Sequence, residues 1–279
     1  MVSFPNAKIN LGLNIIGKRE DGYHNIETVF YPIGWSDILE IVAAKSATAP
    51  VQFKITGSKL IGSKQKNLCL AAYHLLKEKY NLPSVQMHLH KMIPVGAGLG
   101  GGSSDAAATL LLLNKIFNLN ISENDLKQLA ASLGADCAFF IQNKPLFAKG
   151  KGDEFEGISL NLEKYFIVVV KPDVYVSTES AYKNIKPTVP ALSIKEIIAK
   201  PVQEWKGLLV NDFEDKIFKK HPVIRHIKDE LYNSGAVYAS MSGSGSAVYG
   251  IFVRKDSFGE EEINLKSKFA EHEVWSGRG

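Results

Sequence analysis

The chain has little cysteine and no long hydrophobic run. Its 279 residues include two cysteines, Cys69 and Cys137, which lie far apart and form no C-x-x-C motif. We therefore expect two reduced core thiols, as in a cytoplasmic protein. No segment approaches the roughly 18 consecutive apolar residues of a membrane span, and no basic stretch precedes an apolar one at the N-terminus. The sequence predicts a soluble protein that is not exported.

The chain also has only a small net positive charge. Lys and Arg number 33 against 29 Asp and Glu, a formal net charge of +4, and no long basic block is present. This distribution gives no support for a nucleic-acid or a membrane surface as partner. Repeats, low-complexity tracts and Gly/Ser-rich or Pro-rich linkers are missing as well. We expect a folded globular protein. If it has two domains, they pack closely, because no linker separates them.

Two well-known nucleotide-binding signatures are absent. Residues 57–64, GSKLIGSK, have the spacing of a P-loop, but Ser63 precedes Lys64 and so reverses the required order. The H-R-D and D-F-G motifs of protein kinases do not occur. These observations exclude P-loop proteins and protein kinases.

What the sequence does contain is a local concentration of glycine. Five of its 23 glycines lie in residues 96–102, inside the segment PVGAGLGGGSS at 94–104. Glycine tolerates positive φ and lets a ligand approach the backbone, and a helix N-terminus attracts anions. The pattern predicts a phosphate-binding loop before an apolar helix over residues 104–118, with the Ser-Ser-Asp sequence at 103–105 as its N-cap. The alternatives are a flexible turn or, from G-x-G-x-x-G at 96–101, a dinucleotide site.

Strand and helix patterns are mixed along the chain, which predicts an α+β fold. Alternation or apolar runs predict strands at 9–15, 51–56, 85–90, 165–170, 236–241 and 246–252. Helical spacing predicts helices at 67–80, after Ser122 and after Pro222. Residues 143–160 are predicted to be a loop, which favours domains at 1–155 and 156–279.

Three polar features interrupt these apolar patterns. Lys8, Asn10 and Asn14 share one face of the first strand, which faces either solvent or a site. Asp136 lies within GADCAFFI, where a carboxylate must be paired, metal-bound or catalytic, unless it caps a helix. The sequence SMSGSGS at 240–246 is either a simple hairpin loop or a second functional glycine–serine turn.

These motifs together resemble the GHMP kinase superfamily of small-molecule kinases. The likeness rests on PNAKINLGLNI at 5–15, DGYHNIETVF at 21–30, GLGGGSSDAA at 98–107, LGADCAFF at 133–140 and MSGSGSAVYG at 241–250. Within the superfamily, DGYH and the triple glycine resemble members that act on a cytidine diphosphate-linked methylerythritol. The resemblance implies an N-terminal ribosomal-protein-S5-like domain with a left-handed βαβ unit and a C-terminal ferredoxin-like α+β domain.

The resemblance also implies an activity and the residues for it. It implies ATP-dependent phosphorylation of the substrate's 2-hydroxyl in isoprenoid precursor synthesis, with Asp136 as catalytic base and Lys8 as its partner. Mg²⁺ is expected to bridge the phosphates near Ser103 or Ser104, and the metal ligands stay open. The ATP-binding residues implied are Pro94, Val95, Gly96, Ala97, Gly98, Leu99, Gly100, Gly101, Gly102, Ser103 and Ser104, with Asn67, Leu68 and Lys91 around the adenine.

For the substrate, the resemblance implies Asn10, Tyr23, His24, Thr178 and Tyr182. Tyr23 is expected to stack on the cytosine, His24 to hydrogen-bond its edge, and Tyr182 to supply a second ring. Two departures from the common pattern are Ala97 for glycine, tolerated if its φ is negative, and Cys137-Ala138 for Val-Pro.

Two alternatives remain within this fold. One is a GHMP kinase for another small alcohol, and the other is a catalytically silent nucleotide-binding regulator. We expect a monomer or a weak homodimer.

Overall fold

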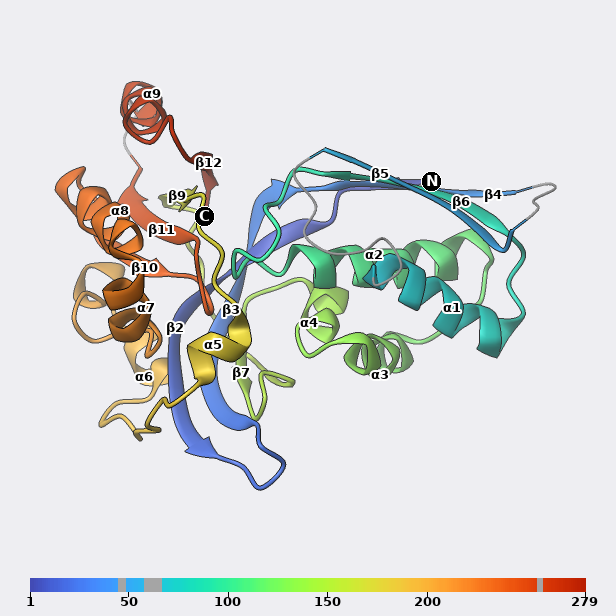
Figure 1. Cartoon of the computed structure of the whole chain (residues 1–279), viewed down its shortest axis with the longest axis horizontal. Helices are drawn as coiled ribbons and strands as arrows, with labels where there is room; N and C mark the ends of the chain where they lie inside the picture. Colours follow the sequence, from blue (N-terminus) through green and yellow to red (C-terminus); the bar gives the residue numbers. More distant parts are fainter. Residues whose placement is uncertain (45–48, 58–66, 255–257) are drawn as a thin grey trace. The chain divides into compact units, whose positions relative to one another are not determined.

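The computed structural model describes residues 1–44, 49–57, 67–254 and 258–279, and the chain divides into two compact units (Figure 1). Unit 1 comprises residues 1–7, 35–95 and 100–144, and unit 2 comprises 8–34, 96–99 and 145–279. Residues 58–64 of the rejected P-loop match lie outside the described residues. Of the described helices, none has the length and apolar character needed to cross a membrane.

Unit 1 is a four-stranded sheet with helices on one side (Figure 1). The strands β1 (Val2–Ser3), β4 (Ile38–Ala43), β6 (Val85–Lys91) and β5 (Val51–Gly57) lie in this order. Strands β5 and β6 are parallel, as the crossover through helix α1 (Leu68–Tyr80) requires, and the other pairs are antiparallel. The remaining helices are α2 (Gly101–Ile116), α3 (Glu123–Leu133) and α4 (Cys137–Gln142).

Side-chain caps begin two of these helices, and of the two only the cap at Ser122 is predicted from the sequence. Asn67 caps α1 by accepting from the Cys69 amide at 2.8 Å, and Ser122 caps α3 by accepting from the Asp125 amide at 3.2 Å. The predicted start of α2 is wrong by three residues, because the helix begins at Gly101 with Gly100 at the N-cap. A Cβ at Gly101 would lie 2.9 Å from Ile93 Cγ2, so close packing requires glycine there despite its poor helix propensity.

The first sheet of unit 2 contains β2 (Asn6–Lys18), β3 (His24–Ser36), β7 (Leu146–Lys149) and β8 (Glu154–Gly157) in that order. The prediction of a loop over 143–160 is wrong, since these residues form the antiparallel β7–β8 hairpin. Its apolar residues Leu146 and Phe147 pair with β3, and this tertiary pairing overrides the Lys- and Gly-rich local composition.

The second sheet of unit 2 has the order β10-β11-β9-β12, entirely antiparallel. Its strands are β9 (Tyr165–Lys171), β10 (Tyr238–Met241), β11 (Val248–Val253) and β12 (Glu273–Arg278). Helices α5 (Thr178–Tyr182), α6 (Ile194–Ile198), α7 (Glu214–Lys220) and α8 (Pro222–Asn233) connect β9 to β10, and α9 (Phe258–Lys268) connects β11 to β12. This βαββαβ order is the ferredoxin-like arrangement that the resemblance implied.

Buried apolar side chains from this sheet and its helices form one core. Val168, Val170, Ile224, Ile227 and Leu231 belong to it, and all are fully buried. The helix predicted after Pro222 is confirmed, and its apolar face packs on the sheet side that carries Val168 and Val170. Helix packing on one face is what makes this antiparallel sheet stable.

Candidate active site

The middle of the glycine-rich loop is bound to the glycine–serine turn between β10 and β11, all within unit 2. The carbonyl oxygen of Gly98 accepts from Ser242 Oγ at 2.9 Å and from Lys8 Nζ at 3.1 Å. The Ala97 carbonyl accepts from the Ala247 amide at 3.1 Å. The turn at 240–246 therefore supports the loop and is more than a hairpin connection.

Gly98 makes this contact possible because it has no side chain. Its φ is +77°, and a Cβ there would lie 2.0 Å from the Ser242 carbonyl oxygen. Ala97 is outside the positive-φ region, which confirms the condition under which alanine is tolerated. The sequence analysis does not single out Ser242 as a site residue. Its position in the glycine–serine turn is the sequence feature that could have indicated it.

Lys8 lies at the centre of these hydrogen bonds. Its Nζ donates to Asn10 Oδ1 at 2.6 Å and lies 4.8 Å from the centroid of the Phe30 ring. Asn10 in turn donates from Nδ2 to Thr28 Oγ1 at 3.0 Å. Lys8 is 3% exposed and Asn10 is 2% exposed, so the solvent-facing interpretation of this strand face is wrong. Asn10 Oδ1, the Gly98 carbonyl oxygen and the Phe30 ring thus fix the direction of the ammonium.

The N-terminus of α2 in unit 1 has the chemistry of an anion site. No side chain caps it, and its first intrahelical hydrogen bond runs from the Ser104 amide to the Gly100 carbonyl at 2.9 Å. The amides of Gly101, Gly102 and Ser103 therefore have no partner within the helix. A Cβ at Gly102 would have no heavy atom within 4 Å among the described residues. Gly102 is exposed, and helix N-terminal amides with open space beside them can bind a phosphate.

Asp136, also in unit 1, lies at the N-cap position of α4, but its side chain makes no cap hydrogen bond there. The helix-cap interpretation is therefore wrong. Its neighbour Cys137 is buried beside Ser103, and burial raises the pKa of this thiol to about 11. Both cysteines are free and buried, as predicted.

The predicted substrate residues of unit 2 lie on β2, where Asn10 is, on β3 and α5, and in the segment before β3. The rings of His24 and Tyr182 stack with centroids 5.0 Å apart at 24°, and Tyr182 also packs edge-on against Phe213. Tyr23 is 61% exposed, with Lys151 Nζ 5.2 Å from its ring centroid. The structure thus brings His24, rather than Tyr23, against Tyr182. Thr178 begins α5 and lies 3.3 Å from Ser244 Oγ.

The residues predicted around adenine belong to unit 1. Asn67 uses its side-chain oxygen to cap α1, and Leu68 begins that helix. Lys91 is 3% exposed, and its Nζ binds the carboxylates of Asp37 and Asp105, the latter at 2.6 Å. Any contact of Lys91 with a nucleotide must therefore come from its stem.

The prediction that Asp105 belongs to the N-cap of α2 is wrong. Asp105 lies in the second turn of the helix, and its side chain is buried, with 2% exposed. Burial raises its pKa and the Asp37 carboxylate adds to the rise, while the Lys91 ammonium opposes it, and the result is a pKa of about 7. Burial lowers the pKa of Lys91, but the two carboxylates outweigh it and the pKa rises. An aspartate in an otherwise apolar helix was the sequence signal for a buried ion pair.

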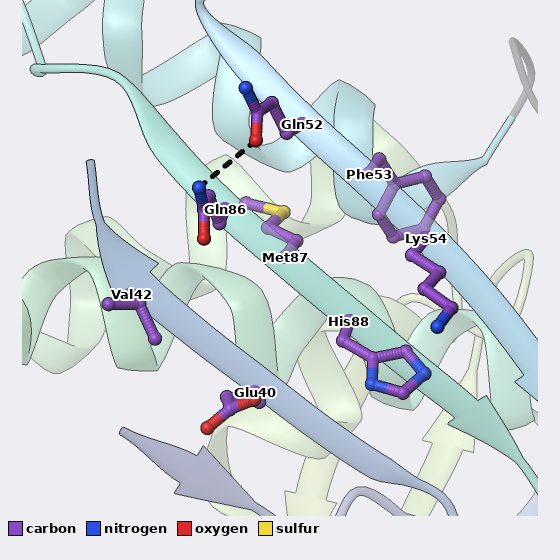
Figure 2. Close-up of a pocket in the computed structure, with 8 residues that line it drawn as sticks. All are labelled: Glu40, Val42, Gln52, Phe53, Lys54, Gln86, Met87 and His88. Atoms are coloured by element: carbon purple, nitrogen blue, oxygen red, sulfur yellow. Dashed lines mark hydrogen bonds between the residues drawn. The ribbon is translucent and has the colours of Figure 1, made fainter. Parts of the chain in front are cut away.

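A separate hollow of about 290 Å³ lies on the open face of the unit 1 sheet, across β4, β6 and β5 (Figure 2). Its lining is mixed, from Glu40 and Lys54 to Phe53 and Met87, and Gln86 donates to Gln52 at 3.0 Å. It contains none of the predicted site residues. Among the described residues, no group of three or more His, Cys, Asp or Glu could hold a metal ion.

Comparison with known proteins agrees with this geometry. Residues 67–144 match the GHMP kinases N terminal domain, and residues 193–269 match the GHMP kinases C terminal domain. A 4-diphosphocytidyl-2-C-methyl-D-erythritol kinase of Bacteroides thetaiotaomicron is 57% identical over 90% of this chain and 92% of its own. One of Parabacteroides distasonis is 50% identical over 100% of this chain and 99% of its own.

Solved structures similar to this chain are also kinases of this superfamily. A crystal structure of 4-(cytidine 5'-diphospho)-2C-methyl-D-erythritol kinase has a TM-score of 0.83 and 31% identity, covering 100% of both chains. A homoserine kinase of Cytophaga hutchinsonii, with a TM-score of 0.64, 17% identity and coverage of 98% and 94%, shares the fold. The chain therefore belongs to the GHMP kinases and, within them, to the 4-diphosphocytidyl-2-C-methyl-D-erythritol kinase family.

Proposed function

We propose that this protein transfers the γ-phosphoryl group of ATP to the 2-hydroxyl of 4-diphosphocytidyl-2-C-methyl-D-erythritol, in the synthesis of isoprenoid precursors. The observation that carries the proposal is the hydrogen bond from the buried Lys8 ammonium to the Gly98 carbonyl in the glycine-rich loop. Family membership at 50–57% identity over nearly the whole chain supports the same activity. Phosphoryl transfer needs little more than positioning and charge stabilisation, and the fixed Lys8 ammonium and the α2 N-terminus support these two roles.

The loop at 94–104 is the proposed binding site for the ATP phosphates. The amides of Gly101, Gly102 and Ser103 and the positive end of the α2 dipole attract the phosphate oxygens. We propose Mg²⁺ as part of the Mg·ATP substrate, bound mainly through the phosphates and water, as is usual for this ion. Asn67, Leu68 and the Lys91 stem remain the proposed adenine contacts.

Asp136 is the proposed general base. Its carboxylate would accept the proton of the 2-hydroxyl as that oxygen attacks the γ-phosphorus. Lys8 would hold the hydroxyl and offset the negative charge on the transferred group. The fixed direction of the Lys8 ammonium, toward Asn10 Oδ1 and the Gly98 carbonyl, favours this role because little reorganisation is needed.

For the cytidine end, we propose Tyr23, His24 and Tyr182 as the aromatic contacts. The stacked pair of His24 and Tyr182 offers a flat surface and a hydrogen-bonding edge, which suit a cytosine ring. Asn10 and Thr178 are the proposed polar contacts to the remainder of the substrate. We further propose a cytoplasmic enzyme, monomeric or weakly dimeric, with its two domains divided near residue 155.

An ADP-release assay with purified protein tests the proposal. We expect saturable turnover with 4-diphosphocytidyl-2-C-methyl-D-erythritol and at most background with homoserine or mevalonate. CMP should compete with the substrate, because it presents the same cytosine ring. Turnover of homoserine or mevalonate alone would identify a kinase for another small alcohol. ATP binding without turnover of any of the three would favour a silent regulator and contradict the proposal.

A further inference from the structure

Asp37, Lys91 and Asp105 form a buried charged cluster at the base of the glycine-rich loop, which we call the anchor cluster. The three residues are 0%, 3% and 2% exposed, and all belong to unit 1. Lys91 is the last residue of β6, Asp37 lies between β3 and β4, and Asp105 is on α2. Lys91 Nζ binds both carboxylates, and it is the one cation that the described residues place between them.

One side of the anchor cluster holds the chain where it enters the loop. The Oδ1 atom of Asp37 accepts from the amides of Met92 and Ile93 at 2.6 and 2.8 Å. Its other oxygen binds Lys91. Asp37 therefore fixes the three residues that directly precede Pro94.

The other side holds the chain where it leaves the loop. Asp105, one turn into α2, binds Lys91 Nζ, and a Cβ at Gly101 would lie 3.4 Å from the same nitrogen. The cluster therefore ties α2, at the residue that directly follows its first turn, to the end of β6 through the Lys91 ammonium. The amides of Gly101, Gly102 and Ser103 are in this first turn.

We propose that the anchor cluster positions the glycine-rich loop for the nucleotide, and that Asp37, Lys91 and Asp105 are positioning residues for ATP binding. This rests on the proposed function only in naming ATP as the ligand. A buried ion pair is weak evidence for a role in stability alone, because the cost of desolvating the charges offsets much of their attraction. The ion pairs fix the position of one structural element relative to another, because each hydrogen bond joins a defined atom on one element to a defined atom on the next.

The orphaned oxygen of Asp105 marks this residue as the one to test. Its Oδ1 atom is buried and has no hydrogen-bond partner among the described residues, whereas Oδ2 binds Lys91. Asp105→Asn keeps an acceptor for Lys91 and the shape of the side chain, but Asp105→Ala removes the acceptor. Leu113→Ala is the matched control, because Leu113 is 0% exposed on the same helix but takes no part in the cluster.

The experiment measures binding of a non-hydrolysable ATP analogue by calorimetry, amide hydrogen exchange at residues 94–104, and kinetics with both substrates. A misplacement of about 1 Å can cost roughly 100-fold, so Asp105→Ala should weaken nucleotide binding by about 10- to 100-fold. It should also speed exchange in the loop and leave KM for the second substrate within about threefold. Asp105→Asn should restore nucleotide binding to within about threefold of wild type.

Unchanged nucleotide binding in Asp105→Ala overturns the proposal, as does failure of Asp105→Asn to restore it. An equal loss of binding in Leu113→Ala also overturns it, because the effect would then follow from a weakened helix. If Asp105→Ala does not fold, Asp105→Leu takes its place, since it fills the space without accepting a hydrogen bond. Binding and exchange need no second substrate, so an inactive wild type would reject the proposed function and leave this test intact.

Discussion

Gly98→Ala is the substitution that most directly tests the contact between the glycine-rich loop and the turn after β10. The new methyl group would lie 2.0 Å from the Ser242 carbonyl oxygen, whereas real Cβ contacts essentially never fall below 3.0 Å. The loop or the turn must therefore move by about 1 Å. The φ of +77° adds strain, because alanine is unfavourable in the left-handed region by about 1–2 kcal/mol.

The displacement and the strain give a total cost in stability. Forcing extra atoms into a packed contact costs about 1–3 kcal/mol, so the sum is about 2–5 kcal/mol. For a chain of this size that corresponds to a fall in Tm of roughly 3–9 °C. The Gly98 carbonyl also accepts from Lys8 Nζ, so moving it displaces the ammonium. We expect kcat to fall by about 100-fold when the protein is assayed well below its Tm.

Scanning calorimetry and the ADP-release assay measure the two effects. Gly17→Ala is the control, because its Cβ would lie 3.6 Å from the nearest atom, Asn25 Nδ2, and its φ is not positive. Its Tm should stay within about 2 °C of wild type, since such a substitution costs under about 0.5 kcal/mol. A Gly98→Ala protein with wild-type Tm and kcat would refute the reasoning from this contact.

Three further predictions concern the base, the buried carboxylate and the aromatic pair. Asp136→Asn should lower kcat by at least ~100-fold, because an amide cannot accept the hydroxyl proton, and wild-type turnover would remove Asp136 as the base. Asp105 has a folded-state pKa of about 7 against an ordinary 3.8, so its contribution to stability is complete below pH 4 and is lost as the pH rises through 7. Wild type should therefore lose more Tm than Asp105→Asn between pH 5 and pH 8, and parallel curves would contradict this shift. Tyr182→Ala removes the stack on His24 and should raise KM for the cytidine substrate about tenfold while KM for ATP stays unchanged, which initial-rate kinetics will show.

Local features of the fold could be predicted because they depend on neighbours in the sequence. Alternation identified β2, β5 and β6, the spacing of apolar residues identified α1, and the cap residue Ser122 located the start of α3. The start of α2 and the β7–β8 hairpin could not be predicted in this way. Gly101 is helical because it packs on Ile93, and β7 is a strand because it pairs with β3.

In the candidate site, too, some features could be predicted from the sequence and others could not. Residue types and spacing were enough to single out the glycine-rich loop, Lys8 and Asp136, because a phosphate site needs bare backbone amides and buried charges are rare. Tertiary structure alone decided that Ser242 binds Gly98, 144 residues away in sequence, and that Asp105 pairs with Lys91 instead of capping its helix. The physical reason is that a polar side chain takes the hydrogen bonds its folded surroundings offer, and those surroundings come from distant parts of the chain.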